Sequence, residues 1–219
     1  MNFYERLQIA TADARAELIS APIINDAMSG KVTREQYLDF LARAFHHVKH
    51  TAPLLMACGS KLPDTMEWLR TAVAHYIEEE IGHHEWILND IAAVGGDAEA
   101  VRKSRPDFDT DVMVAYAYDT VMRRNPAGLF GMVFVLEGTS VRLACSVADT
   151  LAKNLNLPAT AFSYLSSHGA LDVEHMGHFE KVVNRLDRPE DQQAVIDCAN
   201  VFFRLYGNVL RGIARQGAV

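Results

Sequence analysis

Residues 129–152, LFGMVFVLEGTSVRLACSVADTLA, form the most apolar stretch of the chain. Asn125-Pro126 comes just before it, and proline suits the first turn of a helix. The pattern therefore predicts a helix from Pro126 to about Asn154. Because few polar side chains interrupt it, we expect this helix at the centre of the fold, surrounded by the others.

The rest of the chain also shows helical periodicity, in segments separated by short Pro, Gly and Asp turns, with no long alternation typical of strands. Thr33 and Gln36 form a capping box that opens one helix, and Pro53 should kink the same helix. The predicted helices cover residues 3–28, 34–58, 62–94, 110–123, 126–154, 158–185 and 187–215. The predicted fold class is therefore all-α, a single domain over residues 1–219 with about seven helices.

Composition and charge limit the function. The 219 residues carry a formal net charge of −7 and no basic run, which argues against a nucleic-acid partner. The longest apolar run, residues 129–136, is too short to span a membrane, and the charged N-terminus lacks an apolar signal core. Three scattered cysteines, Cys58, Cys145 and Cys198, resemble buried thiols of a reducing compartment. We expect a cytoplasmic protein.

All nine histidines of the chain fall into three clusters. Random placement would scatter them, so the clustering suggests a shared purpose. The clusters are His46, His47 and His50; His75, His83 and His84; and His168, His175 and His178.

The third histidine cluster contains a metal-ligand pattern. His168, Asp172 and His175 occupy positions i, i+4 and i+7, which fall within roughly 60° on one side of a helix. Two imidazoles and a carboxylate on one stripe suit Fe, Mn or Zn. A solvated polar face would place Lys, Glu or Gln at these angles, whereas the flanking Leu171 and Phe179 are apolar and indicate an inward stripe.

The second histidine cluster follows a run of glutamates, EEEIGHH at residues 78–84. Glu80 and His83 are three positions apart, and Glu79 and His83 four, so either pair can share a helix face. Glu-x-x-His recurs in carboxylate-bridged di-iron bundles, although alone it is a weak signal. Gly82 is a poor helix former and predicts a local irregularity here.

Glu137 interrupts the apolar helix of residues 129–152. A lone carboxylate buried there is costly unless it is paired or bound to a metal. An ion pair with Arg142 would satisfy it, as would hydrogen bonds from Thr139 or Ser140. Arg142 lies five positions on, off the favoured helical spacing, so a ligand role is the stronger interpretation.

Together these motifs offer three carboxylates and three imidazoles from three helices. Two iron ions with three protein ligands each would keep open positions for dioxygen and substrate. The expected metal ligands are Glu80, His83, Glu137, His168, Asp172 and His175.

The motifs resemble those of a known family. The chain is similar to the TenA/PqqC-like branch of the haem-oxygenase-like proteins, and within it to the di-iron oxidases and oxygenases. That family places Glu and His on one helix, a lone Glu farther along, and then His-x3-Asp-x2-His. This sequence shows EIGH at residues 80–83, Glu137 in VLEG and HGALDVEH at residues 168–175. The resemblance covers nearly the whole chain.

The resemblance implies a haem-oxygenase-like fold and an enzyme that uses dioxygen to oxidise a small organic molecule, such as a fatty acid or an amino acid. Its cofactor would be two Fe(II)/Fe(III) ions, the second held weakly, and an external electron donor could serve it. The resemblance also implies catalytic roles for Glu137, His168 and Asp172, and a homodimer.

One departure from the family concerns residues 45–50, FHHVKH, where some relatives carry an extra Glu. Histidines there could replace it, line the pocket or hydrogen-bond a ligand carboxylate. The residues expected to support the metal ligands, or to act as additional ligands, are Glu79, His46, His47, His50, His84 and His178.

Other interpretations stay open. A cofactorless oxidase of the PqqC type would use histidines as acids and bases, and a thiaminase-type enzyme would use a cysteine nucleophile, with Cys145 the nearest candidate. A non-catalytic or regulatory bundle would use the polar core only to bind a ligand. Haem oxygenase itself fits poorly, because no histidine precedes His46.

Overall fold

The computed structural model describes residues 1–213, except the side chains of Arg142, Cys145 and residues 168–174. Every regular element in that range is helical, which confirms the predicted all-α class. The α-helices are α1 (Phe3–Ala10), α2 (Ala12–Ile19), α3 (Pro22–Met28), α4 (Arg34–Val48), α5 (Thr51–Lys61), α6 (Glu67–Glu80), α7 (His83–Val94), α8 (Ala98–Lys103), α9 (Phe108–Arg123), α10 (Leu129–Leu155), α11 (Ser163–Val183) and α12 (Pro189–Arg211). Short 3₁₀ helices are η1 (Asp64–Met66), η2 (Pro126–Gly128) and η3 (Ala159–Ala161).

The described chain has more α-helices than the seven or so predicted, because the expected helices over residues 3–28, 34–58 and 62–94 are broken. Pro53 does not kink a continuous helix. It lies in the first turn of α5, after a break at Lys49, where its missing N–H has no helical partner to lose. Gly82 separates α6 from α7 with a φ of 92°, a left-handed conformation that favours glycine.

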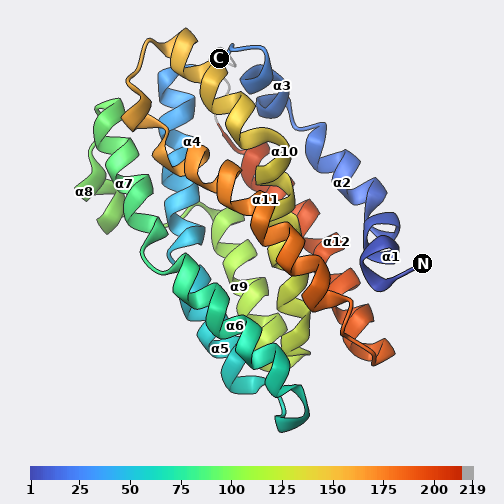
Figure 1. Ribbon diagram of the computed structural model, residues 1–219. Helices are drawn as coiled ribbons and strands as arrows, with labels where there is room; N and C mark the ends of the chain where they lie inside the picture. The colour runs from blue at the N-terminus through green and yellow to red at the C-terminus, as the bar shows by residue number, and fades with distance from the viewer. Residues whose placement is uncertain (214–219) are drawn as a thin grey trace.

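The apolar helix α10 lies inside the bundle, as predicted, and packs against α11 and α12 (Figure 1). Its N-terminal half, residues 129–135, belongs to a hydrophobic cluster shared with α5, α6, α9, α11 and α12. Its C-terminal half contributes Ala144, Ala148 and Leu151 to a second cluster, shared with α4 and α7. Glu137 therefore lies where the two apolar clusters meet.

Among the described residues, no single helix has the length and apolar composition of a membrane span. Residues 126–141 and 146–155 pass that test only as a pair, and they are bent by 53° relative to each other. The long central helix α10 is therefore bent, and the bend comes shortly after Glu137.

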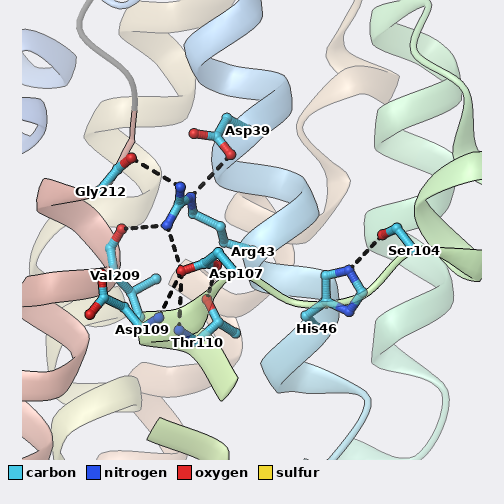
Figure 2. A network of polar contacts seen from close by, with 9 residues as sticks. All are labelled: Asp39, Arg43, His46, Ser104, Asp107, Asp109, Thr110, Val209 and Gly212. Atoms are coloured by element: carbon cyan, nitrogen blue, oxygen red, sulfur yellow. Dashed lines mark hydrogen bonds and ion pairs between the residues drawn. The ribbon is translucent and has the colours of Figure 1, made fainter. Parts of the chain in front are cut away.

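A polar network around Arg43 joins three helices (Figure 2). The Arg43 guanidinium of α4 lies 3.0 Å from Asp39 and 2.9 Å from Asp107, the residue that caps the N-terminus of α9. It also donates hydrogen bonds to the carbonyl oxygens of Val209 and Gly212, at the end of α12. We refer to these five residues as the Arg43 network.

Candidate metal centre

Glu80 and His83 meet at a break between two helices and not on one helix face. Glu80 is the last residue of α6, and His83 is the first residue of α7. The turn through Gly82 brings His83 Nδ1 to 3.3 Å from Glu80 Oε2, and both side chains are buried. The predicted pairing is therefore present, and the predicted irregularity at Gly82 produces it.

His83 is also held by an aromatic neighbour. Its ring stacks on Trp86 with 4.0 Å between the ring centroids and 29° between the planes. Stacking restricts the rotation of the imidazole, so its nitrogens keep their direction relative to Glu80.

Glu137 and His175 approach each other from the two long helices of the bundle. Glu137 of α10 and His175 of α11 are both buried, with 3.9 Å between Glu137 Oε1 and His175 Nδ1. The rings of Tyr76 and His175 pack edge to face, with 6.2 Å between their centroids. The hydroxyl of Ser140 makes no hydrogen bond among the described residues, so it does not satisfy Glu137.

Glu80, Glu137 and His175 converge. One ligand atom of each lies within 4.8 Å of the other two, and the residues are 8%, 8% and 5% exposed. Two carboxylates so close together repel each other in a buried site, and a cation between them removes that cost. Carboxylate oxygens and an imidazole nitrogen are ligands that iron accepts. The three donors therefore fit an iron ion.

Two predicted ligands cannot be placed. His168 and Asp172 lie in α11, two turns and one turn before His175, but their side chains are outside the described part of the chain. The i, i+4, i+7 register runs along a helical backbone, as the pattern requires. Their roles as metal ligands, and the catalytic roles of Glu137, His168 and Asp172, stay predictions.

His46, His50 and His84 make contacts away from the converging donors. His46 Nε2 lies 2.8 Å from the Ser104 hydroxyl, and His50 Nδ1 lies 3.2 Å from the Tyr118 hydroxyl. Burial, with a smaller effect of Lys49, lowers the pKa of both imidazoles. His84 sits near the surface, 3.3 Å from Glu85. These contacts are with Ser104, Tyr118 and Glu85, so none of the three histidines is shown in contact with a converging donor.

Glu79 and His178 occupy the side of His175 that faces α6. Glu79 Oε2 lies 3.3 Å from His175 Nε2, so this glutamate contacts a converging donor without being one of the three. The His178 ring packs edge-on against His75 and Tyr76, and burial lowers its pKa. His178 thus belongs to the packing around the site.

His47 is the one histidine of the predicted FHHVKH group that lines the main cavity among the described residues. The cavity measures ≈160 Å³, and Glu80 and Glu137 form part of its wall. Tyr206 of α12 also lines it, with its ring centroid 5.9 Å from that of His47. Desolvation raises the pKa of Tyr206 to about 12, so its phenol stays neutral.

Tyr206 cannot be identified from the sequence, because its place beside His47 depends on the approach of α12 to α4. Tyr76, which also lines the cavity, lies four residues before Glu80. Because residues four apart share a helix face, this spacing could have identified Tyr76.

The cavity otherwise has an apolar wall that follows α10 from Met132 to Leu151. At 1.5 Å per residue this is a path of roughly 28 Å along the helix. None of its described lining residues is lysine or arginine. The cavity is therefore suited to an elongated, weakly charged molecule.

The described cysteines do not resemble nucleophiles. Cys58 and Cys198 are buried, and burial raises the pKa of each thiol to about 12. Thiols with such a pKa carry almost no thiolate at neutral pH. The third cysteine, Cys145, has its side chain outside the described part.

A comparison with known families agrees with this donor set. The chain matches the family model described as iron-containing redox enzyme over residues 38–207. The chain belongs to this family of iron-containing redox enzymes. The matched range contains all three converging donors and most of the residues that line the cavity. A search of curated proteins found no match.

Solved structures show the same fold. A Shewanella denitrificans domain of unknown function with a haem-oxygenase-like fold is 23% identical, with a TM-score of 0.84 over 97% of this chain and 92% of its own. A TenA homologue from Pseudomonas syringae pv. tomato is 13% identical, with a TM-score of 0.82 over 96% and 92%. Haem oxygenase-2 from Synechocystis, in complex with haem and NO, is 14% identical, with a TM-score of 0.77 over 97% and 85%. The chain therefore has the haem-oxygenase-like fold that was predicted.

Proposed function

We propose that this protein is a non-haem iron oxidase or oxygenase that uses dioxygen to oxidise a small, largely apolar organic molecule. The observation that carries the proposal is the convergence of Glu80, Glu137 and His175, because the first two of these residues also line the cavity. A substrate in that cavity lies directly beside the metal donors. Iron bound there would supply the binding and activation of dioxygen.

The chain's own residues would hold the metal from four helices. Glu80 and Glu137 provide charge and His175 provides a neutral nitrogen, which together suit Fe(II). His83, already against Glu80, and the two α11 residues His168 and Asp172 complete the donor set that a second ion would need. We therefore propose two iron ions, one of them more weakly held.

The cavity indicates the class of substrate. Its long apolar wall favours a chain-like molecule such as a fatty acid over a compact, highly charged one. His47 and Tyr206 are hydrogen-bonding groups within this wall, and the phenol of Tyr206 is neutral, so they are suited to orienting a polar group of the substrate. The apolar side chains exclude water from the space next to the metal donors.

The test is anaerobic loading with Fe(II), removal of free metal, and measurement of iron per chain and of oxygen uptake with fatty acids of graded length. We expect bound iron in the wild type and oxygen uptake that depends on a substrate. His175→Ala should lose both. Oxygen uptake by the metal-free wild type would instead favour the cofactorless oxidase, and iron binding without uptake would favour a binding role.

The same preparation addresses the remaining proposals. An external electron donor is required if a single turnover of the reduced, iron-loaded enzyme stops after one equivalent of substrate. The homodimer is tested by the mass of the loaded enzyme in solution.

A further inference from the structure

The His175 ring lies between two carboxylates. Its Nδ1 is 3.9 Å from Glu137 Oε1, on the side where the three donors converge, and its Nε2 is 3.3 Å from Glu79 Oε2. A neutral imidazole that binds a metal through one nitrogen carries its proton on the other. A metal next to Glu137 therefore leaves the Nε2–H of His175 directed at Glu79.

Glu79 is itself held on both oxygens. Its Oε1 lies 3.3 Å from Nε2 of His75, one turn earlier on α6. The side chains become progressively more exposed along this line, from 6% at His175 to 31% at Glu79 and 51% at His75. A chain of polar contacts thus runs from the metal centre to the surface.

Three consecutive glutamates at the end of α6 have three different surroundings. Glu78 is exposed, Glu79 faces His175 of α11, and Glu80 is buried in the cavity wall. Successive helical residues point about 100° apart, so only one of the three can face the metal. The geometry leaves Glu79 beside a ligand and Glu80 at the metal position.

We infer that Glu79 is a positioning residue of the metal centre. It accepts the Nε2 proton of His175, which fixes the nitrogen that faces the metal, and His75 restrains Glu79 in turn. This inference rests on the function proposed above. A direct ligand role for Glu79 is less consistent with the structure, because each of its oxygens lies against an imidazole nitrogen and it is not among the three converging donors.

The experiment measures metal affinity and not turnover. Apo protein is titrated anaerobically with Co(II), whose visible absorption reports binding and ligand geometry. The variants are Glu79→Ala and Glu79→Gln, with Glu78→Ala as the matched control one position away. Thermal unfolding of the metal-free forms checks that all variants fold alike.

Glu79→Ala should weaken Co(II) binding by about 10–100-fold, the usual effect of removing a group that orients a ligand. The number of ions bound at saturation should stay that of the wild type. Glu79→Gln, whose amide oxygen can still accept the Nε2–H bond, should recover part of the affinity. Glu78→Ala should match the wild type.

Two results would overturn the inference while leaving the proposed function intact. Wild-type affinity in Glu79→Ala would remove any role for this residue. A lower number of ions at saturation would make Glu79 a ligand. If the wild type itself binds neither Co(II) nor Fe(II), the proposed function fails, and the inference fails with it.

Discussion

The Arg43 network and the metal centre both bring carboxylates together from different helices, half-buried in the network and buried in the centre, but the side chains next to these carboxylates differ. In the network, one guanidinium lies between Asp39 and Asp107 (Figure 2). At the metal centre the neighbouring groups are imidazoles, with His83 beside Glu80 and His175 beside Glu137.

This difference separates a structural cluster from one that can bind metal. Arginine keeps its proton in proteins and has no lone pair to offer, so Arg43 can only form ion pairs and donate hydrogen bonds. A neutral imidazole offers a lone pair to a metal ion. The aspartates of the network are therefore neutralised by a group that cannot bind metal, whereas the glutamates of the centre lie beside groups that can share a metal ion with them.

The strongest way to break this comparison is to remove both carboxylates from the metal centre. Glu80→Gln combined with Glu137→Gln should lower iron affinity by more than about 100-fold, since ligands are worth more than the groups that support them. Metal-free stability should stay constant or rise, because two buried like charges disappear. The iron content per chain after anaerobic loading tests the loss of affinity. Thermal unfolding of the metal-free protein tests the expected stability. Unchanged iron content would contradict the assignment.

The opposite result is expected at the network. Arg43→Met should reduce the free energy of unfolding by about 2 kcal/mol or more, because charged hydrogen bonds of partly buried groups are lost. Iron per folded chain should stay that of the wild type. Urea unfolding measures the loss, and Arg123→Met is the control, because the exposed pair of Arg123 with Asp119 contributes less than about 1 kcal/mol. Equal losses in the two variants would remove the structural role of the network.

Two glycines of α10 give a second contrast, between a tightly packed position and an open position next to the metal centre. A Cβ on Gly131 would lie 2.5 Å from the Val195 carbonyl oxygen and 2.6 Å from the Ala199 nitrogen, so Gly131→Ala should destabilise by about 1–3 kcal/mol. A Cβ on Gly138, next to Glu137, would meet nothing within 4 Å. Gly138→Ala should therefore stabilise by up to about 1 kcal/mol through helix propensity.

Thermal unfolding of the two alanine variants, side by side, tests this contrast. A loss of stability at Gly138 would show a packing constraint beyond those that the described residues impose. Slower oxygen uptake in a more stable Gly138→Ala variant would indicate that the gap beside Glu137 serves the substrate.

The sequence predicts those site residues whose role follows from their neighbours along the chain. Glu137 stood out because a carboxylate in the most apolar helix needs a partner, and the structure places it among converging donors. Glu80 and His83 were paired for an incorrect reason, since a left-handed turn at Gly82 joins them and a helix face does not.

Other features depend on packing between distant segments. The position of His47 in the cavity wall follows from how α4 meets α12, which no periodicity within α4 encodes. The break at Lys49 was also missed, because the helical pattern continues across it.

The smallest expected effect concerns an imidazole outside the metal centre. Lys49 can only donate, so His46 Nδ1 accepts from it, at 3.2 Å, while Ser104 donates to the Val101 carbonyl and accepts from His46 Nε2. This arrangement requires a neutral ring. Burial first, and then Lys49, lower the pKa of His46, against an opposing effect of Asp107.

Because the folded-state pKa lies below the unfolded value of about 6.5, this group stabilises the protein above that pH and loses the contribution as the pH falls toward the folded pKa. In His46→Gln, the free energy of unfolding should depend less on pH than in the wild type. Some pH dependence should remain, because the pKa of His50 is lowered in the same way. Thermal unfolding of metal-free protein between roughly pH 7.5 and 5.5 measures the difference. An identical pH dependence in the wild type and His46→Gln would mean that His46 is not held neutral, and its contacts with Lys49 and Ser104 would then need a different assignment of donors and acceptors.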